Sequence, residues 1–325
     1  MDTTELPRTI HQPIHSDLLP RLLQEYTEVH NQSALHQIPI QDLPWDPECR
    51  KAPPVQGGSS PLQVGSVKDY QLSKFQVRVF TPEGSEAPKE GWPVFLFFHG
   101  GGWTLGNINT ENAFSSNMCK RARCVVVSVD YRLGPENPYP AAVQDAEEAL
   151  HWVISSSKEL NVNLAKYAVG GSSSGGNLAA ILTHKAALAN PPIPLVFQVL
   201  VVPVTDNNAS PDNTLYPSWQ ECANTVALVP KKMLWFKNNY SPNSEDWTKW
   251  DNSPILAPQD TFKKAPPAWI GVAELDILRD EGLAYGKKLR KAGVTVETKV
   301  YKGAPHPIMA MDGAYIIWYI AISSC

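Results

Sequence analysis

Three consecutive serines lie within a run of glycines at residues 170–176, Gly-Gly-Ser-Ser-Ser-Gly-Gly. A short predicted strand at 167–170 leads into this run, and a predicted helix at 177–188 follows it. A strand-to-helix turn of this sharpness requires small residues two positions before and two positions after the residue at its apex. Among the three serines, only Ser173 has glycine at both of those positions. The spacing therefore predicts Ser173 as the nucleophile at the apex.

A second cluster of glycines, His-Gly-Gly-Gly-Trp at residues 99–103, follows a short apolar run. Consecutive glycines let the backbone turn several N–H groups toward one point without clashes from side chains. Such donors stabilise the oxyanion of a tetrahedral intermediate, and removing one donor typically costs ~3–4 kcal/mol in the activation barrier. The cluster matches neither of the glycine motifs that cradle phosphates. We expect an oxyanion hole made of the backbone N–H groups of Gly101, Gly102 and Ser174, with Trp103 as a substrate-binding residue.

A serine nucleophile needs an adjacent base, which is most often histidine. In one established chain order, Ser…Asp…His, the base follows the nucleophile. Of the eight histidines, only His184 and His306 come after the serine turn. His184 belongs to the helix that leaves the turn, so it points away from the apex. We therefore expect His306, on a loop after a predicted strand at 294–301, to be the base, and His99 to shape its own loop by hydrogen bonding.

The base in turn needs a carboxylate that fixes its tautomer and orientation. Asp276 lies just past a predicted strand at 268–272, where such an acid is expected. Asp280 is closer to the start of the next helix, and capping of that helix explains it better. We expect Asp276 in this role, with Glu274 as the alternative.

Strands and helices alternate along the chain from residue 75 onward. The strand at 75–79 alternates apolar and polar residues, whereas several later runs are almost continuously apolar and suit strands buried on both faces. This alternation predicts a mostly parallel sheet with helices on both faces. The buried strands are expected at 93–98, 124–129 and 195–202, and helices at 141–155, 177–188, 231–239 and 281–292.

Two segments interrupt this rhythm. Residues 17–29 carry a helical stripe of apolar side chains, and an irregular arm with six prolines follows at 37–67. Residues 205–264 hold a further six prolines and four tryptophans. We expect residues 1–67 to form an N-terminal cap, and residues 68–325 to form the catalytic domain, with 205–264 adding cap elements. A helix packed on the core, and a surface excursion with its own small core, are the alternatives for these segments.

The composition excludes several classes of protein. A hydrophobic fraction of 43% is too high for a disordered chain. A net charge of −4 provides no basic surface for a nucleic acid. Although 29 prolines are nearly twice the usual number, they fall mainly at the edges of predicted elements and in the irregular segments at 37–67 and 205–264, so they do not indicate disorder. The length of 325 residues suggests two domains, but the order of the motifs favours one core with a discontinuous cap.

The five cysteines are widely spaced and form no C-x-x-C, which argues against a disulfide framework and against a thiolate zinc site. The first residues lack the features of a signal peptide. No apolar stretch approaches the roughly 20 residues of a membrane span. We expect a soluble cytoplasmic protein with no metal ligands and no membrane span.

Together these motifs resemble the hormone-sensitive-lipase-like branch of the α/β-hydrolase fold, a large group of carboxylesterases. The resemblance covers roughly residues 75–306, and its motifs are specific in their order and spacing. Besides the glycine loop and the serine turn, they are Asp-Tyr-Arg-Leu-Gly-Pro-Glu at 130–136, Pro-Tyr-Pro-Ala-Ala at 138–142, Ser-Pro at 253–254 and the acidic segment at 276–282.

The resemblance implies an α/β-hydrolase fold with an N-terminal cap. It also implies a serine hydrolase that cleaves small-molecule carboxylic esters with short to medium acyl chains through an acyl-enzyme. Such proteins need no cofactor, and they are often homodimers.

The chain departs from the family pattern in three places. The elbow of the family usually reads G-D-S-A-G, whereas Ser172 and Ser174 flank the nucleophile here, so the acidic hydrogen-bonding residue before it is missing. Pro305 and Pro307 bracket His306, where the family usually has a glycine after the histidine. The final segment at 312–325 is short and apolar compared with the usual closing helix.

Other functions are compatible with the same residues. Hydrolases of amides, lactones or thioesters, and acyltransferases, share the acyl-enzyme. A binding protein on this fold that has lost its base is a further alternative, against which the presence of His306 argues.

Overall fold

The structure is a computed structural model that describes residues 8–51, 57–84, 87–212, 215–308 and 311. It contains one sheet of eight strands in the order β1-β2-β4-β3-β5-β6-β7-β8. The pairs β1–β2 and β2–β4 are antiparallel, and all other pairs are parallel. The prediction of a mostly parallel sheet is therefore confirmed. The strands are β1 (Ser66–Gln71), β2 (Gln76–Thr81), β3 (Trp92–Phe98), β4 (Val125–Asp130), β5 (Val162–Ser172), β6 (Phe197–Val201), β7 (Ala268–Ala273) and β8 (Val296–Tyr301).

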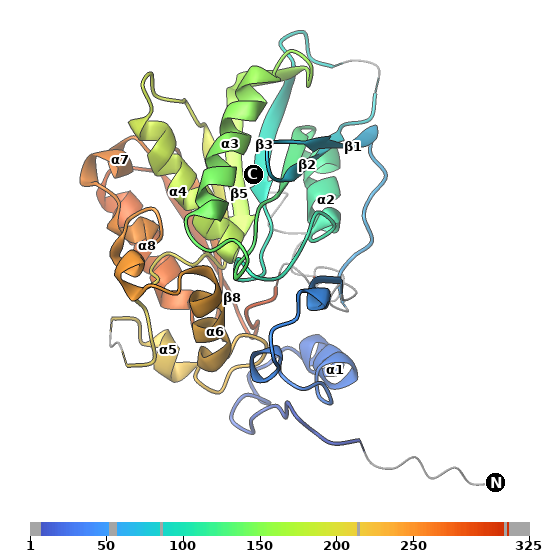
Figure 1. Cartoon of the computed structure of the whole chain (residues 1–325), viewed down its shortest axis with the longest axis vertical. Coiled ribbons are helices and arrows are strands. Elements are labelled where there is room, and N and C mark those ends of the chain that lie inside the picture. Colours follow the sequence, from blue (N-terminus) through green and yellow to red (C-terminus); the bar gives the residue numbers. More distant parts are fainter. Residues whose placement is uncertain (1–7, 52–56, 85–86, 213–214, 309–310, 312–325) are drawn as a thin grey trace, which may run out of the picture.

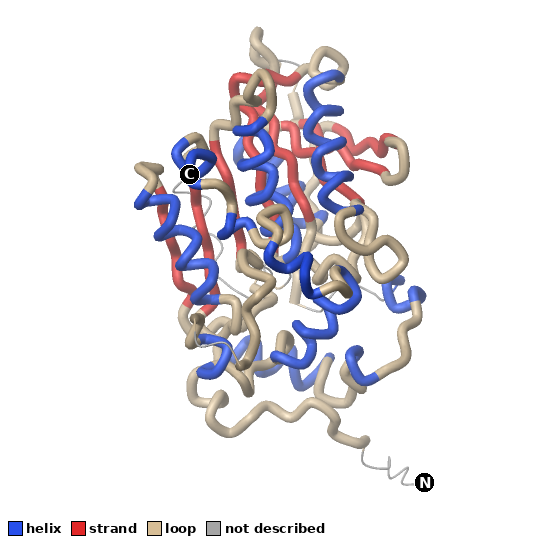
Figure 2. Tube along the Cα trace, turned by 60° about the vertical axis from the view of Figure 1, so that its left-hand side comes forward, coloured by secondary structure: helices blue, strands red, loops and turns tan. Residues whose placement is uncertain are grey.

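Helices pack along both faces of this sheet, as Figures 1 and 2 show. Helix α2 packs on β2 and β4, whereas α4 packs on β3, β5 and β6, and α8 on β7 and β8. The helices are α1 (Gln24–Ser33), α2 (Asn112–Ala122), α3 (Ala141–Ser155), α4 (Ser174–Leu188), α5 (Ser218–Glu221), α6 (Pro230–Tyr240), α7 (Gln259–Lys263) and α8 (Arg279–Lys291), with short 3-10 turns at Ile40–Asp42, Pro47–Lys51, Ser244–Thr248 and Pro254–Leu256.

Strand β3 shows why an almost continuously apolar run forms a central strand here. Successive side chains of a strand point to opposite faces. Val94, Leu96 and Phe98 join the larger core cluster beneath α3 and α4. Phe95 and Phe97 join the second cluster, which includes Phe114 of α2. Both faces of the strand are therefore covered, and no alternation with polar residues is needed.

The first helix differs from its predicted position. The apolar stripe predicts a helix from residue 17 to residue 29, but residues 16–22 form turns and α1 begins at Gln24. Pro20 lies inside the predicted span, and it lacks the N–H group that an interior position of a helix requires. Leu18 and Leu22 are nevertheless buried, so the stripe correctly identifies the packed face of this segment.

The segment at 205–264 contributes α5, α6 and α7, and Pro230 occupies the first turn of α6, directly before the helix predicted at 231–239. The N-terminal arm lies against this segment and against the glycine loop. Arg50 donates to the carbonyl oxygens of Thr104 and Gly134, at 2.7 Å each. Asp42 forms an ion pair with Lys231 of α6, with 2.5 Å between oxygen and nitrogen. In Figure 1, α1, α5 and α6 lie at the same end of the molecule.

No helix in the described part of the chain is long and apolar enough to cross a membrane. Among the described residues, no group of three or more histidines, cysteines and acids is placed to hold a metal ion. The cysteines within the described ranges, at 49, 119, 124 and 222, are free.

A buried carboxyl group joins the segment at 205–264 to α8. Glu281 has no exposed surface, and its Oε1 accepts from the backbone N–H groups of Thr205 at 2.8 Å and Asp206 at 3.3 Å. Its Oε2 accepts from Trp219 Nε1 at 3.4 Å. Burial raises the pKa of Glu281 from 4.5 to about 8, because the charged form loses its hydration.

A buried lysine lies near this carboxyl group. Lys237 is 1% exposed, donates to the carbonyl oxygen of Ala209 at 2.9 Å, and places its ammonium nitrogen 4.2 Å from the ring centroid of Trp247. Burial lowers the pKa of Lys237 from 10.5 to about 8. The pKa shift of Glu281 makes the free energy of unfolding depend on pH below about pH 8, and the pKa shift of Lys237 does so above about pH 8.

We predict that Glu281 makes the fold less stable as the pH rises toward 8. Because folding raises its pKa from 4.5 to about 8, its contribution is complete below the lower value and is lost as the pH passes through the higher one. Glu281→Gln keeps the acceptor oxygen but cannot titrate. Between about pH 5 and pH 8, the free energy of unfolding should fall by roughly 2–4 kcal/mol more in the wild type than in the variant. Urea unfolding at a series of pH values measures this difference, and equal slopes would contradict it.

Candidate active site

The serine turn joins β5 to α4, with Ser173 at its apex. Ser173 has φ 53° and ψ −116°, a conformation that residues with a side chain rarely adopt. Its N–H group donates to the carbonyl oxygen of Val201 at 2.8 Å, which ties the turn to β6. A Cβ atom on Gly171 would overlap the backbone of Gly175, and one on Gly175 would overlap the carbonyl oxygen of Phe98. The two glycines that select Ser173 in the sequence are therefore required by contacts in the turn.

The three residues predicted as nucleophile, base and acid lie in hydrogen-bond contact. His306 Nε2 lies 2.9 Å from Ser173 Oγ, and His306 Nδ1 lies 2.7 Å from Asp276 Oδ2. Each residue follows the carboxyl end of a parallel strand, namely β5, β7 or β8. Both distances are within the range needed for proton transfer and for orientation of the ring. The arrangement can deprotonate Ser173 and stabilise a positive charge on the imidazole.

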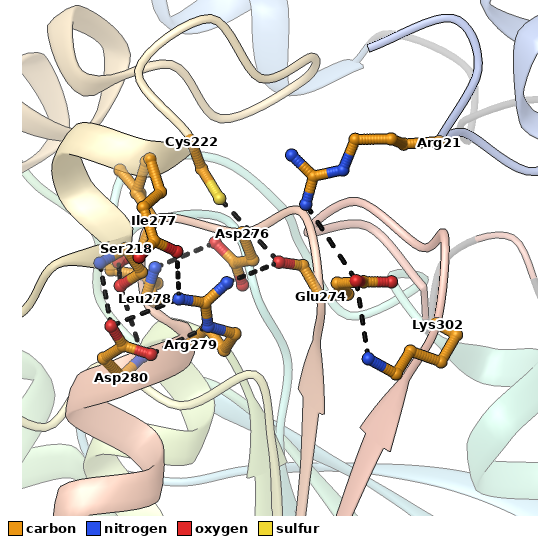
Figure 3. A network of polar contacts seen from close by, with 11 residues as sticks. Arg21, Ser218, Cys222, Glu274, Asp276, Ile277, Leu278, Arg279, Asp280 and Lys302 are labelled. Atoms are coloured by element: carbon orange, nitrogen blue, oxygen red, sulfur yellow. Dashed lines mark hydrogen bonds and ion pairs between the residues drawn. The ribbon is translucent and has the colours of Figure 1, made fainter. Parts of the chain in front are cut away.

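A network of polar contacts holds the loop that carries the acid (Figure 3). Asp276 is fully buried, and its Oδ1 accepts from the N–H group of Leu278 at 3.0 Å. Ser218 Oγ donates to the carbonyl oxygen of Ile277 at 2.6 Å, and Arg279 donates to that of Glu274 at 3.1 Å. With its Oδ1 bonded to the backbone, the Asp276 carboxylate is fixed in the position where its Oδ2 contacts His306.

Glu274, the alternative acid, contacts the base loop instead of the base. Its Oε2 accepts from the N–H group of Gly303 at 2.9 Å, and Lys302 and Arg21 lie at 3.5 Å and 4.0 Å (Figure 3). The Gly303 amide, followed by Lys302 and then Arg21, holds the pKa of Glu274 below its ordinary value. Its position therefore connects the loop after β7 to the loop after β8.

The sequence predicts that Asp280 caps α8, but in the structure it does not. The N-cap position belongs to Leu278, and Asp280 lies in the first turn of the helix. Its carboxylate accepts from the backbone N–H group of Ser218 at 2.8 Å and pairs with Arg279 at 2.7 Å. Asp280 thus connects α8 to α5, a contact between distant segments that a local capping pattern does not reveal.

The two prolines beside His306 are compatible with its position in the site. The carbonyl oxygen of His306 accepts from the N–H group of Ile308 at 2.8 Å. Upstream, the carbonyl oxygen of Gly303 accepts from the N–H group of Leu23 at 3.0 Å. Pro305 and Pro307 therefore restrain a loop that is also hydrogen-bonded on both sides of the base. The final segment at 312–325, which departs from the family pattern, lies outside the described residues.

The glycine loop has the backbone freedom expected of an oxyanion hole. Gly101 and Gly102 have φ values of +119° and +60°. Within the described part of the chain, no hydrogen bond uses either N–H group as a donor. Ser174 is the first residue of α4, and the N–H group at that position has no acceptor within its own helix. All three groups are available to a ligand.

The two histidines that are not expected to act as bases are engaged elsewhere. His99 donates from Nδ1 to the carbonyl oxygen of Gly100 at 2.6 Å, and its ring stacks on Tyr131 with 4.5 Å between centroids. Burial lowers the pKa of His99, which favours the neutral form of its ring. His184 is hydrogen-bonded to Thr261 and Tyr285, at 2.7 Å and 3.0 Å.

Aromatic side chains enclose the glycine loop. Trp103 is fully buried and stacks on Tyr240 of α6 with 4.2 Å between ring centroids. A Cβ atom on Gly102 would overlap the ring of Phe236, which is also on α6. Sequence reasoning missed Phe236 and Tyr240, although the concentration of aromatic residues at 205–264 was a signal that this segment covers the site.

The chain is similar to known proteins over most of its length. The family model for the α/β hydrolase fold matches residues 95–310. The AB hydrolase superfamily protein C1039.03 of Schizosaccharomyces pombe is 44% identical over 92% of this chain and 91% of its own. Carboxylesterase NlhH of Mycobacterium tuberculosis is 38% identical over 70% of this chain and 68% of its own.

Solved structures agree with these sequence matches. A thermostable esterase from Pseudomonas putida ECU1011 superimposes with a TM-score of 0.79 at 31% identity, covering 94% of each chain. An esterase from Pyrobaculum calidifontis gives a TM-score of 0.73 at 32% identity over 81% of this chain and 84% of its own. With the fold, the order of the motifs and these relatives in agreement, the chain belongs to the α/β-hydrolase family, in its hormone-sensitive-lipase-like branch.

Proposed function

We propose that this chain is a serine carboxylesterase, a carboxylic ester hydrolase with Ser173 as nucleophile, His306 as base and Asp276 as the acid that orients the base. The observation that carries the proposal is the continuous chain of contacts from Ser173 Oγ to His306 Nε2, at 2.9 Å, and from His306 Nδ1 to Asp276, at 2.7 Å. Relatives that are named carboxylesterase and esterase support the same activity.

In the first half of the reaction, His306 Nε2 takes the proton of Ser173 Oγ while that oxygen attacks the ester carbonyl carbon. The carbonyl oxygen becomes an oxyanion, which the N–H groups of Gly101, Gly102 and Ser174 stabilise by hydrogen bonds. The tetrahedral intermediate then expels the alkoxide, and His306 returns the proton to it. An alcohol leaves, and the acyl group remains on Ser173.

In the second half, a water molecule replaces the alcohol. His306 removes a proton from the water, and the resulting hydroxide attacks the acyl carbon. When the second intermediate collapses, Ser173 Oγ leaves and recovers its proton from His306. The product is a free carboxylic acid, and no cofactor or metal ion enters the balance. Because Asp276 is fully buried, its charge acts on the imidazolium with little screening by water.

The substrate side of the proposal is a small-molecule ester with a short to medium acyl chain. Residues 1–67 and 205–264 would form a discontinuous cap over the catalytic domain at 68–325. The contacts of Arg50 with the glycine loop, and of Asp42 with α6, support this division. Trp103 is proposed as a substrate-binding residue, where its stacking on Tyr240 would fix the wall next to the oxyanion hole.

The proposal also includes a cytoplasmic location and a homodimer. The sequence composition supports the first, and the family resemblance supports the second.

We predict that Asp276 and Glu274 differ sharply in their effect on turnover. Asp276→Asn keeps the shape but favours the wrong tautomer of His306, so kcat should fall by ~10⁴. Glu274→Gln removes charge from the base loop without touching the ring, so kcat should fall by no more than ~10-fold. Hydrolysis of 4-nitrophenyl butyrate measures both.

Ser173→Ala serves as the reference for complete loss. This variant should neither turn over the ester nor react with a fluorophosphonate probe, while the wild type should do both. Full activity of Ser173→Ala, or a larger loss in Glu274→Gln than in Asp276→Asn, would contradict the assignment.

We also predict that Gly101→Ala abolishes most of the activity. Its added Cβ would overlap the carbonyl oxygen of Leu105, so the loop must move. Displacing an oxyanion donor typically lowers kcat ~10²–10³-fold. Gly84→Ala is the matched control, because Gly84 has φ +120° with no atom of a described residue within 4 Å of an added methyl carbon, whereas Gly101 has φ +119° in a crowded loop. The control should lose stability to thermal unfolding but retain its kcat, and equal kcat values for the two variants would exclude the loop from catalysis.

A further inference from the structure

The residue before the nucleophile is a buried serine whose hydroxyl group reaches a distant acid. Ser172 is the last residue of β5 and is 3% exposed. Its Oγ donates to Glu111 Oε1 at 2.6 Å. This distance lies in the range of hydrogen bonds to an ionised carboxylate, which are shorter and stronger than neutral ones. We propose that Glu111 supplies the carboxylate missing from the serine turn, and acts through Ser172 as a positioning residue for Ser173.

The conformation of Glu111 supports this role. Glu111 occupies the N-cap position of α2 with φ 61° and ψ 26°, in the left-handed region. A strained residue of this kind costs about 1–3 kcal/mol and persists only where its surroundings hold it. A side chain at an N-cap usually bonds to the first turn of its own helix, but that of Glu111 makes no such bond. It extends to the serine turn instead.

The pair also packs against the backbone of the glycine loop. A Cβ atom added to Gly100 would lie 2.7 Å from Ser172 Oγ and 3.5 Å from Glu111 Oε1. Ser172 and Glu111 therefore fill the space beside Gly100, the residue that precedes the proposed donors. One hydrogen bond thus lies against both the turn that carries the nucleophile and the loop that carries the oxyanion hole.

The serine on the other side of the nucleophile is tied to the same region. Ser174 Oγ lies 3.3 Å from Tyr131 Oη, which donates to the carbonyl oxygen of His99 at 2.8 Å. Burial raises the pKa of Tyr131, and the nearby charge of Glu111 raises it further. The phenol therefore remains protonated and can keep donating. Ser174 therefore connects the strained turn to the glycine loop through Tyr131, whereas Ser172 connects it to the carboxylate of Glu111.

Moving the carboxylate from position 111 to position 172 tests this proposal. Ser172→Asp places an acid in the turn while Glu111 is still present, so two carboxylates would face each other in a buried space. We expect kcat for 4-nitrophenyl butyrate to fall at least ~100-fold, because like charges at this distance repel strongly. Adding Glu111→Gln to Ser172→Asp leaves a single carboxylate and should restore kcat to within ~10-fold of the wild type. Since the pair positions the nucleophile, KM should change less than kcat throughout.

The single substitutions and a control complete the design. Glu111→Gln weakens the bond and Ser172→Ala removes it, and each should lower kcat ~3–30-fold. Ser115→Ala is the matched control, because Ser115 is a fully buried serine of α2 whose hydroxyl group has no hydrogen-bond partner among the described residues. Its kcat should stay within about 2-fold of the wild type. Thermal unfolding of each variant identifies any decrease in kcat that results from partial unfolding of the protein.

The proposal is overturned if Glu111→Gln fails to rescue Ser172→Asp while both variants remain folded, or if Ser172→Asp retains wild-type kcat. The role of Glu111 rests on the proposed function, and a failure of that function would give a different experimental result. A wild type that neither hydrolyses the ester nor reacts with the phosphonate would contradict the esterase assignment itself. A wild type active through Ser173, with no rescue in the double variant, would contradict only the role of Glu111.

Discussion

The turn at Ser173 holds its residue at φ 53° and ψ −116°, and the remainder of the site depends on this strained geometry. A side chain in that region costs free energy, so the surrounding structure must fix it. The N–H group of Ser173 bonds to Val201, and its carbonyl oxygen accepts from Val204 at 3.2 Å. Gly171 and Gly175 permit the close backbone approaches that these bonds require. The stability of the central sheet thus maintains Ser173 in a backbone conformation that an isolated peptide would not adopt.

Much of the fold and of the site could be predicted because their signals are local. The sequence of β3 is almost entirely apolar because both faces of the strand are covered. The serine turn has glycines at the fixed spacing that its close contacts require. The prediction is wrong at the start of α1, where the apolar stripe continues through Pro20 but the helix does not. Helix α2 escapes prediction because its buried face includes small polar residues such as Ser115 and Ser116, which weaken the apolar period.

The contacts that support the site could not be read from the sequence because they join distant residues. Ser172 and Glu111 are separated by 61 positions, and Arg50 and Thr104 by 54. No local pattern marks Glu111 or Arg50 as a partner of the site, so only the folded chain brings these pairs together. Glu274 illustrates the same limit, since its place in the sequence suits an acid of the site. Only the structure distinguishes the two acids, because Glu274 accepts from the amide of Gly303 whereas Asp276 contacts the ring of His306.

The boundary between cap and core is less sharp than the length of the chain suggests. Leu23, just before α1, donates to the carbonyl oxygen of Gly303, whose N–H group bonds to Glu274. Arg21 lies 4.0 Å from that same acid. The N-terminal segment therefore helps to hold the loop after β8 at Gly303, which is close to His306 in the sequence. A cap of the proposed kind that made no such contacts could be displaced without altering the loop after β8, but this segment is hydrogen-bonded to that loop. The position of the N-terminal segment and that of the loop before His306 consequently depend on the same few contacts.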